Sequence, residues 1–274
     1  MNFKNSIKLI ALLLLFSCDN NEDIAIKEET YTPIETLSRA DICVDCCKCL
    51  SLSTAPLPWD YPAKPGTEEW NQLKSHQEKI DACQIPGGIL LSLSTENLTR
   101  ICVQYPLLYD IFAFSFFPTG GEILFDDFNG IRELFKRENA SKELLKHYNY
   151  MTSNLNLLGV DETIFVQYMM ANAALEWMLG FYSQEVNITT ENYRDILRCL
   201  VIGYIEKYKL YVDFPHDLWY QANFYARAHV IDKICPQCLE KLPLQDRNSV
   251  LNGGKVRGKE IRDIINELSY QLIN

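Results

Sequence analysis

Two pairs of polar side chains interrupt apolar stretches in the second half of the chain. Asn172 and Glu176 are four residues apart and share one face of a helix, as do Asn223 and Arg227, with His229 close by. If these two faces meet, burial would raise the pKa of the Glu176 carboxyl, and His229 would serve as its proton partner. Such a pair is the general acid and base of a hydrolase.

A second interpretation of the same residues is structural. A buried Glu–Arg or Glu–His bridge fixes the register of neighbouring helices without any chemistry. The sequence favours this interpretation, since the chain has only four histidines and lacks the H-E-x-x-H, G-x-S-x-G, Walker and dinucleotide-binding motifs. A non-catalytic protein is therefore the first expectation and a hydrolase the alternative.

Four cysteines have the spacing of two chelating pairs. Cys43 and Cys46 are three residues apart, as are Cys235 and Cys238. Thiolates at this spacing bind one side of a tetrahedral Zn²⁺, and a second pair completes the site. Disulfides and free or intermolecular thiols remain alternatives, because thiols outside the cytoplasm tend to be oxidised. A zinc module held by these four residues is a further possible function.

The N-terminus has the features of an export signal. Lys4 and Lys8 precede an apolar stretch over 9–16, which is too short to span a bilayer. Leu15-Phe16-Ser17-Cys18 then resembles the lipobox of bacterial lipoproteins, although Phe16 replaces the usual small residue. The resemblance implies a signal peptide over 1–17 and acyl chains on Cys18. A cysteine beside an ordinary cleavage site is the alternative.

The charge of the chain restricts its partners. There are 36 acidic and 26 basic residues, for a net charge of −10, and removal of 1–17 with its two lysines gives −12 for the mature chain. A negative net charge excludes a duplex nucleic-acid partner, because phosphates would repel the protein. An anionic membrane would repel it as well, so acyl chains are required to hold it there. The acidic run over 19–23 resembles the signal that exports Bacteroides-type lipoproteins to the outer leaflet, or it is a solvated part of a tether.

The rest of the chain divides into a tether and a helical domain. Residues 18–66 contain five prolines and no sustained helical periodicity, which predicts an extended, lipidated tether with a cysteine cluster. Helical patterns fill 67–274. In the clearest of them, apolar residues recur every three or four positions and form one face of a helix: Tyr193, Ile196, Leu197, Leu200, Val201, Tyr204, Ile205 and Tyr208. Lys207 is assigned to the polar surface of the same helix.

One predicted helix, over 164–179, is apolar on nearly every face, so it is expected at the centre of the domain. Helix N-caps are expected at Thr67, Thr95, Ser141, Asp161 and Thr190, and Gly180 and Gly253–Gly254 are expected to end helices. Strand-like alternation is limited to short ambiguous stretches. The prediction is an all-α fold of about nine or ten helices, in a bundle or an irregular stack of helical hairpins.

Several short sequence motifs between residue 59 and the C-terminus support the predicted cell-envelope location and the all-α fold. They are Trp59-Asp60-Tyr61-Pro62, the stretch 64–70, Ala82-Cys83-Gln84-Ile85-Pro86, Tyr105-Pro106-Leu107-Leu108, Phe128-Asn129-Gly130 and Asn266-Glu267-Leu268-Ser269-Tyr270. With them the chain resembles a family of uncharacterised lipoproteins of Bacteroides-type bacteria. The resemblance implies an all-α body at the cell envelope and assigns no activity and no catalytic residues.

These observations together predict a lipid-anchored protein of the cell envelope, on the outer membrane and facing outward, with a non-catalytic binding or accessory role. Aromatic side chains stack on sugars and anchor protein interfaces. Trp59, Tyr61 and Trp70 are therefore candidates for an exposed surface that binds an unknown protein or glycan partner.

Overall fold

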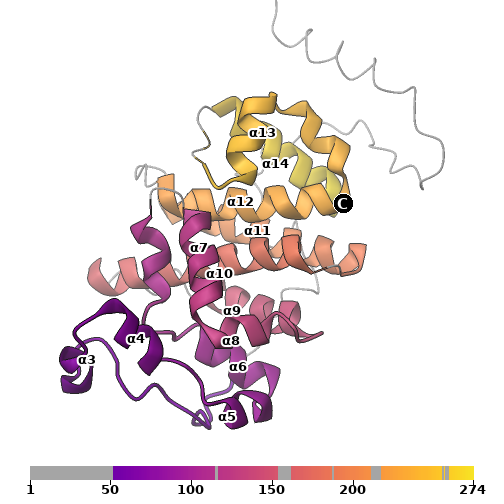
Figure 1. Cartoon of the computed structure of the whole chain (residues 1–274). Coiled ribbons are helices and arrows are strands. Elements are labelled where there is room, and N and C mark those ends of the chain that lie inside the picture. The colour runs from indigo at the N-terminus through magenta and orange to yellow at the C-terminus, as the bar shows by residue number, and fades with distance from the viewer. Residues whose placement is uncertain are drawn as a thin grey trace, which may run out of the picture. The chain divides into compact units, whose positions relative to one another are not determined.

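A computed structural model describes residues 52–114, 117–153, 162–186, 188–210, 217–254, 256 and 259–274 (Figure 1). All of these residues belong to one unit, Thr32–Asn274. Every regular element in these ranges is a helix, and no strand occurs among them. The all-α prediction is therefore confirmed. The predicted signal peptide, Cys18, Cys43 and Cys46 lie outside the described residues.

The first part of the described chain consists mostly of short helices, and the longest helices follow it. The first part of the described chain holds α3 (Glu68–Gln72), α4 (His76–Ala82), α5 (Gly87–Ser92), α6 (Thr95–Cys102), the 3₁₀ helix η2 (Leu108–Ala113), α7 (Phe117–Asp127) and α8 (Asn129–Leu134). The second part holds α9 (Ala140–Ser153), α10 (Glu162–Glu185), α11 (Thr190–Leu210), α12 (Asp217–Ile234), the 3₁₀ helix η4 (Pro236–Lys241), α13 (Leu244–Leu251) and α14 (Lys259–Ile273). Nine of these described elements have seven residues or more, in agreement with the predicted number.

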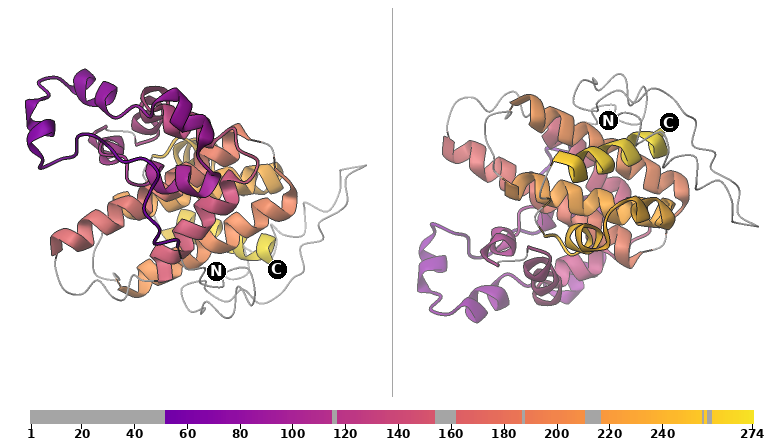
Figure 2. Two further views of the ribbon diagram at one scale, coloured as in Figure 1. Left: turned by 90° about the horizontal axis from the view of Figure 1, so that it is seen from below. Right: turned by 90° about the horizontal axis from the view of Figure 1, so that it is seen from above.

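Helix α10 occupies the middle of the fold. Every residue from 172 to 183 is buried, as expected for a helix that is apolar all round. In Figure 1, α3, α4, α5, α6 and α8 lie below α10, α7 crosses in front of it, and α12, α13 and α14 lie above it. Figure 2 shows α10, α11 and α12 running beside one another, and α10 also packs against α9, η2 and α7. The arrangement is an irregular stack of helices around one central member.

No helix in the described ranges combines the length and the apolar character needed to cross a bilayer.

Gly180 does not end a helix, contrary to the prediction. Helix α10 continues through it to Glu185. A Cβ at this position would lie 2.8 Å from the Cα of Ala226 on α12. The glycine therefore serves the close approach of α10 and α12, and neighbouring core contacts outweigh its weak helix propensity. Gly253 follows α13 and has a φ of 66°, so the second predicted stop is confirmed.

The body begins before residue 67, which corrects the predicted boundary of the tether. Tyr61 and Ala63 are buried. The Tyr61 hydroxyl donates a hydrogen bond of 2.9 Å to the carbonyl oxygen of Ile101 at the end of α6. Thr67 caps α3 as predicted, since its side chain accepts from the backbone N–H of Trp70. The other predicted caps are not confirmed: Thr95, Ser141 and Thr190 lie within α6, α9 and α11, and Asp161 lies outside the described residues. The segment from 52 to 66 is extended, as its prolines require, but it packs on the domain.

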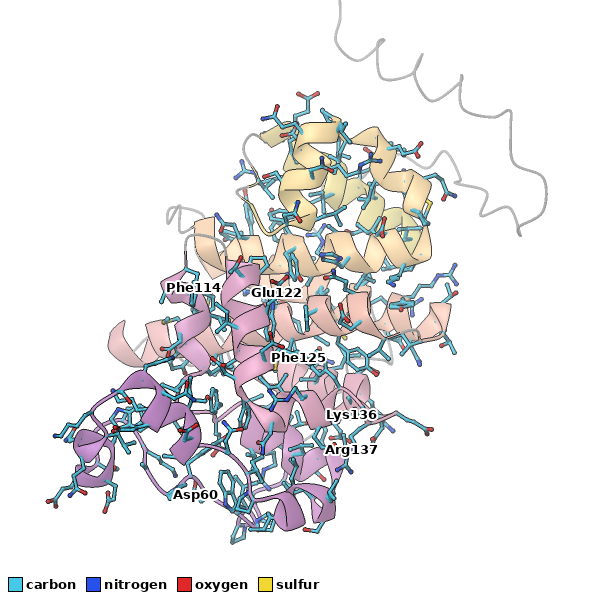
Figure 3. The ribbon with its side chains drawn as sticks, viewed as in Figure 1. Asp60, Phe114, Glu122, Phe125, Lys136 and Arg137 are labelled. Carbon is cyan, nitrogen blue, oxygen red and sulfur yellow. A yellow bond between two sulfur atoms is a disulfide. The ribbon has the colours of Figure 1, made fainter. Side chains whose placement is uncertain are left out.

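Short elements are held together by side chains that bind backbone carbonyls. Arg137, labelled in Figure 3, follows α8. Its guanidinium donates to the carbonyl oxygens of Leu90 and Leu93 at 3.4 and 3.3 Å. The same guanidinium pairs with Glu133 at 2.8 Å. These contacts occupy carbonyls at the C-terminal end of α5 and connect it to α8.

Candidate functional site

Glu176, the acidic residue selected from the sequence, lies in the core with no exposed surface. Its Oε2 accepts a hydrogen bond from Lys207 Nζ at 2.6 Å, in an ion pair whose side chains are 0% and 1% exposed. Its Oε1 accepts from the hydroxyl of Tyr148 at 2.6 Å and from Asn223 Nδ2 at 2.8 Å. We refer to Tyr148, Glu176, Lys207 and Asn223 as the Glu176 cluster.

Each member of the Glu176 cluster comes from a different helix. Tyr148 is on α9, Glu176 on α10, Lys207 on α11 and Asn223 on α12. Asn223 Nδ2 also donates to the carbonyl oxygen of Leu200 on α11 at 2.9 Å. A one-turn shift of any of these helices would break at least one of these bonds. The cluster therefore fixes the register of the four helices, in the way expected of buried polar networks that specify one arrangement.

A glycine on α11 makes room for the tyrosine of the cluster. A Cβ built on Gly203 would lie 1.8 Å from the Tyr148 hydroxyl oxygen and 2.6 Å from the ring carbon that carries it. These distances are far inside van der Waals contact, so any side chain here displaces Tyr148 from Glu176. Glycine is therefore required at 203 by packing, since its φ lies outside the left-handed region that favours glycine.

Gly203→Ala is expected to lower the free energy of unfolding by about 1–3 kcal/mol, because the added methyl overpacks the core and strains the Tyr148 bond. Urea unfolding followed by circular dichroism measures the change. Gly88→Ala on α5 is the matched control, since a Cβ there meets nothing within 4 Å. It should leave stability unchanged or slightly higher. Equal stabilities of the two variants would contradict the assigned packing at Gly203.

Burial sets the protonation behaviour of the Glu176 cluster. Desolvation lowers the pKa of Lys207, and the charge and hydrogen bond of Glu176 act in the opposite direction. Desolvation, followed by the nearby Glu176 charge, holds the pKa of Tyr148 well above its ordinary value. Tyr148 therefore keeps its proton and acts as a hydrogen-bond donor. Glu176 has no exposed surface, and its carboxylate accepts hydrogen bonds from all three other members of the cluster.

His229 is not the partner of Glu176. It is 9% exposed, and its Nε2 lies 2.9 Å from the carbonyl oxygen of Leu251 at the end of α13. Its ring meets Tyr225 edge-on at 4.5 Å between centroids. No hydrogen bond or ion pair joins His229 to Glu176 in the part of the chain that the structure describes. The place that the sequence interpretation gave to His229 is taken by Lys207.

Arg227 forms a second buried polar centre. Its Nη2 donates to Asn266 Oδ1 at 2.8 Å, to the carbonyl oxygen of Ile265 at 3.0 Å and to Ser269 Oγ at 2.8 Å, all on α14. Its guanidinium lies 5.3 Å from the ring centroid of Tyr204 on α11. Arg227 thus joins α12 to α14 and α11, and the sequence-based alternative of a Glu176–Arg227 bridge does not occur.

Lys207 and Tyr148 are site residues that the sequence interpretation missed. Lys207 is buried, which corrects its assignment to the polar surface of its helix. The signal is present in the spacing, because Ile196, Leu200, Gly203 and Lys207 follow one another at steps of four, three and four. A lysine that is buried in such a series needs an acidic partner, and Glu176 is the one acidic residue of the apolar stretch 164–179.

The three aromatic residues proposed as a binding surface are mostly core. Tyr61 is 6% exposed and Trp70 is 9% exposed, which corrects the expectation that both face solvent. Trp59 is partly buried and meets Tyr61 edge-on at 4.7 Å between ring centroids. Lys79 lies over the Trp70 ring at 5.1 Å. These rings hold the first segment of the body against the helices, where each has a packing role.

The cysteines that the structure describes are either paired or buried. Cys235 and Cys238 form a disulfide with a Cα–Cα distance of 5.4 Å, so in this state they offer no thiolates to a metal. Cys43 and Cys46 lie outside the described residues, and the four-cysteine zinc site stays a prediction. Three further cysteines are buried and lie outside this disulfide: Cys83, Cys102 and Cys199. Burial raises the pKa of the Cys83 thiol to about 11 and that of Cys102 further.

Within the described ranges, no three His, Cys, Asp or Glu residues come together in a way that could hold a metal ion. Comparisons of the chain with protein-family models, with curated proteins and with solved structures give no match.

Proposed function

We propose that this chain is a lipid-anchored protein of the cell envelope, whose helical body is a non-catalytic binding or accessory module. Acyl chains on Cys18 hold it to the outer membrane, and the body faces outward, toward a protein or glycan partner. The observation that carries the proposal is the motif Leu15-Phe16-Ser17-Cys18 directly after a short apolar stretch with a basic start. Two or three acyl chains suffice for stable anchoring, which a single chain does not provide.

The arrangement of the Glu176 cluster supports a non-catalytic role. A general acid or base must lie within hydrogen-bond reach of the substrate atom that it protonates or deprotonates. Glu176 has no exposed surface and binds the ammonium, hydroxyl and amide groups of Lys207, Tyr148 and Asn223. The carboxylate joins four helices. The strongest candidate for a catalytic acid or base therefore has a structural role.

Cys18→Ala is expected to abolish incorporation of labelled palmitate and to move the protein from the membrane fraction to the soluble fraction of its bacterium. Removal of the thiol eliminates the attachment point, and the acidic body has no electrostatic attraction to an anionic bilayer. Metabolic labelling followed by fractionation measures both effects. Asn21→Ala, three residues away, keeps the thiol and should retain both label and membrane association. Labelling of Cys18→Ala at the wild-type level would overturn the proposed anchor.

Protease treatment of intact cells tests the outward orientation separately. Asp19→Asn combined with Glu22→Gln and Asp23→Asn removes the acidic run behind Cys18. If this run directs export, the triple variant keeps its palmitate but becomes protected from external protease, while the wild type is digested. Digestion of both proteins to the same extent would assign the run to a solvated tether.

A further inference from the structure

Asn172 is a buried polar side chain whose amide has no hydrogen-bond partner in the described part of the chain. The residue has no exposed surface, and neither its Oδ1 nor its Nδ2 is bonded. It precedes Glu176 by one turn of α10, so the two side chains lie on the same face of the helix.

Asn223 adds a second unsatisfied atom next to the same carboxylate. Its Nδ2 donates to Glu176 Oε1 at 2.8 Å and to the Leu200 carbonyl oxygen at 2.9 Å. Because both of these partners are acceptors, the orientation of the amide is fixed. Its Oδ1 is buried and has no hydrogen bond among the described residues. One donor group and two acceptor oxygens of two asparagines therefore remain unsatisfied near Glu176.

The chemistry of these atoms selects the kind of molecule that would satisfy them. Leaving three buried polar atoms unbonded would cost a large part of the stability of a folded domain. A cation would be repelled by the Asn172 amide hydrogens and the Lys207 ammonium. An anion would be repelled by the Glu176 carboxylate and the Asn223 oxygen. An apolar molecule would bond to none of them. The group that fits must be small, neutral, and able both to donate and to accept hydrogen bonds.

We propose that Asn172 and Asn223 form a binding site for internal water beside the Glu176–Lys207 ion pair. Water has both donor and acceptor capacity, and buried waters make about three hydrogen bonds to groups of this kind. Glu176 Oε2 accepts one described bond, from Lys207, and a carboxylate oxygen has capacity for a second. Water bound here partly hydrates the ion pair, which reduces the desolvation that burial imposes on both charges.

The test uses the full chain with ¹⁵N-labelled asparagine and measures transfer of magnetisation from water to side-chain amide protons. The expected result is a direct water cross-peak at the Asn172 amide. Asn266 is the control, because it is equally buried and its oxygen accepts from Arg227. It should show no water cross-peak. Absence of the cross-peak at Asn172 in the folded wild-type protein would overturn the proposal without any variant.

A variant supplies an independent readout. Asn172→Leu keeps the volume of the side chain but removes its hydrogen-bonding groups. Magnetic relaxation dispersion of the water signal should report at least one fewer long-lived water molecule in the variant. The urea midpoint should fall, because Asn223 and Glu176 lose hydrogen bonds through that water. A rise in the urea midpoint is the result expected for a dry, unsatisfied amide, and it would contradict the proposed site.

Discussion

Lys207→Met is expected to lower the free energy of unfolding by about 3–5 kcal/mol, because it leaves the buried carboxylate of Glu176 without its cation. Methionine matches the length of the lysine side chain, so the cavity that remains is small and the charge effect dominates. Equilibrium unfolding in urea, followed by circular dichroism at neutral pH, measures the difference. An effect of this size is a large fraction of the stability of a typical domain.

Two further variants separate the ion pair from simple packing. Lys259→Met removes an equally short ion pair on the surface, since Lys259 lies 2.6 Å from Asp263 with side chains 80% and 42% exposed. It should cost no more than about 1 kcal/mol. The double variant Lys207→Met with Glu176→Gln removes both charges but keeps an acceptor oxygen for Tyr148 and Asn223, and it should recover much of the loss. If Lys207→Met costs no more than Lys259→Met, Lys207 does not hold a buried charge.

The stability of the body is expected to fall as the pH is lowered from about 6.5 to about 4. His147 on α9 is buried, and desolvation lowers its pKa to about 4, with smaller effects of Lys146 and Arg100. The unfolded chain takes up this proton near pH 6.5, whereas the folded chain resists it. The contribution of His147 to the free energy of unfolding is therefore fully present above pH 6.5. It is lost as the pH falls toward 4, by about 3 kcal/mol at most. Burial also lowers the pKa of His229, which acts in the same direction.

Urea unfolding at a series of pH values between 7 and 4 measures this dependence. His147→Gln removes the titrating group and should flatten the slope, whatever its effect on absolute stability. Thr152→Ser, at another buried position of α9, changes packing without removing a titrating group and should keep the slope of the wild type. A slope that is unchanged in His147→Gln would show that His147 is protonated equally in the folded and unfolded chains.

The helical fold and its centre could be predicted because they follow from local patterns. Residues 164–179 are apolar on nearly every face, and such a helix is stable only where neighbours cover it on all sides. The structure places α10 there. The N-cap at Thr67 is equally local, since the capping hydrogen bond joins residues three positions apart. Predictions of this kind need no knowledge of what packs against the helix.

The partners of Glu176 could not be predicted in the same way. Its bonds to Tyr148, Lys207 and Asn223 join residues 28, 31 and 47 positions away, and one sequence does not specify which faces of distant helices meet. Gly180 illustrates the same limit, because a glycine within a helix serves equally as a stop or as a point of close approach. Only the position of Ala226 on α12 decides between these uses.

The buried thiols of Cys83, Cys102 and Cys199 give the molecule a built-in reporter of its own opening. Alkylating reagents attack thiolates, and these three groups are screened from solvent, with the pKa of Cys83 and of Cys102 raised. Their modification would therefore proceed only through molecules that have unfolded locally or globally. The time course of alkylation at these three residues, followed by mass spectrometry, would therefore report how often the body opens.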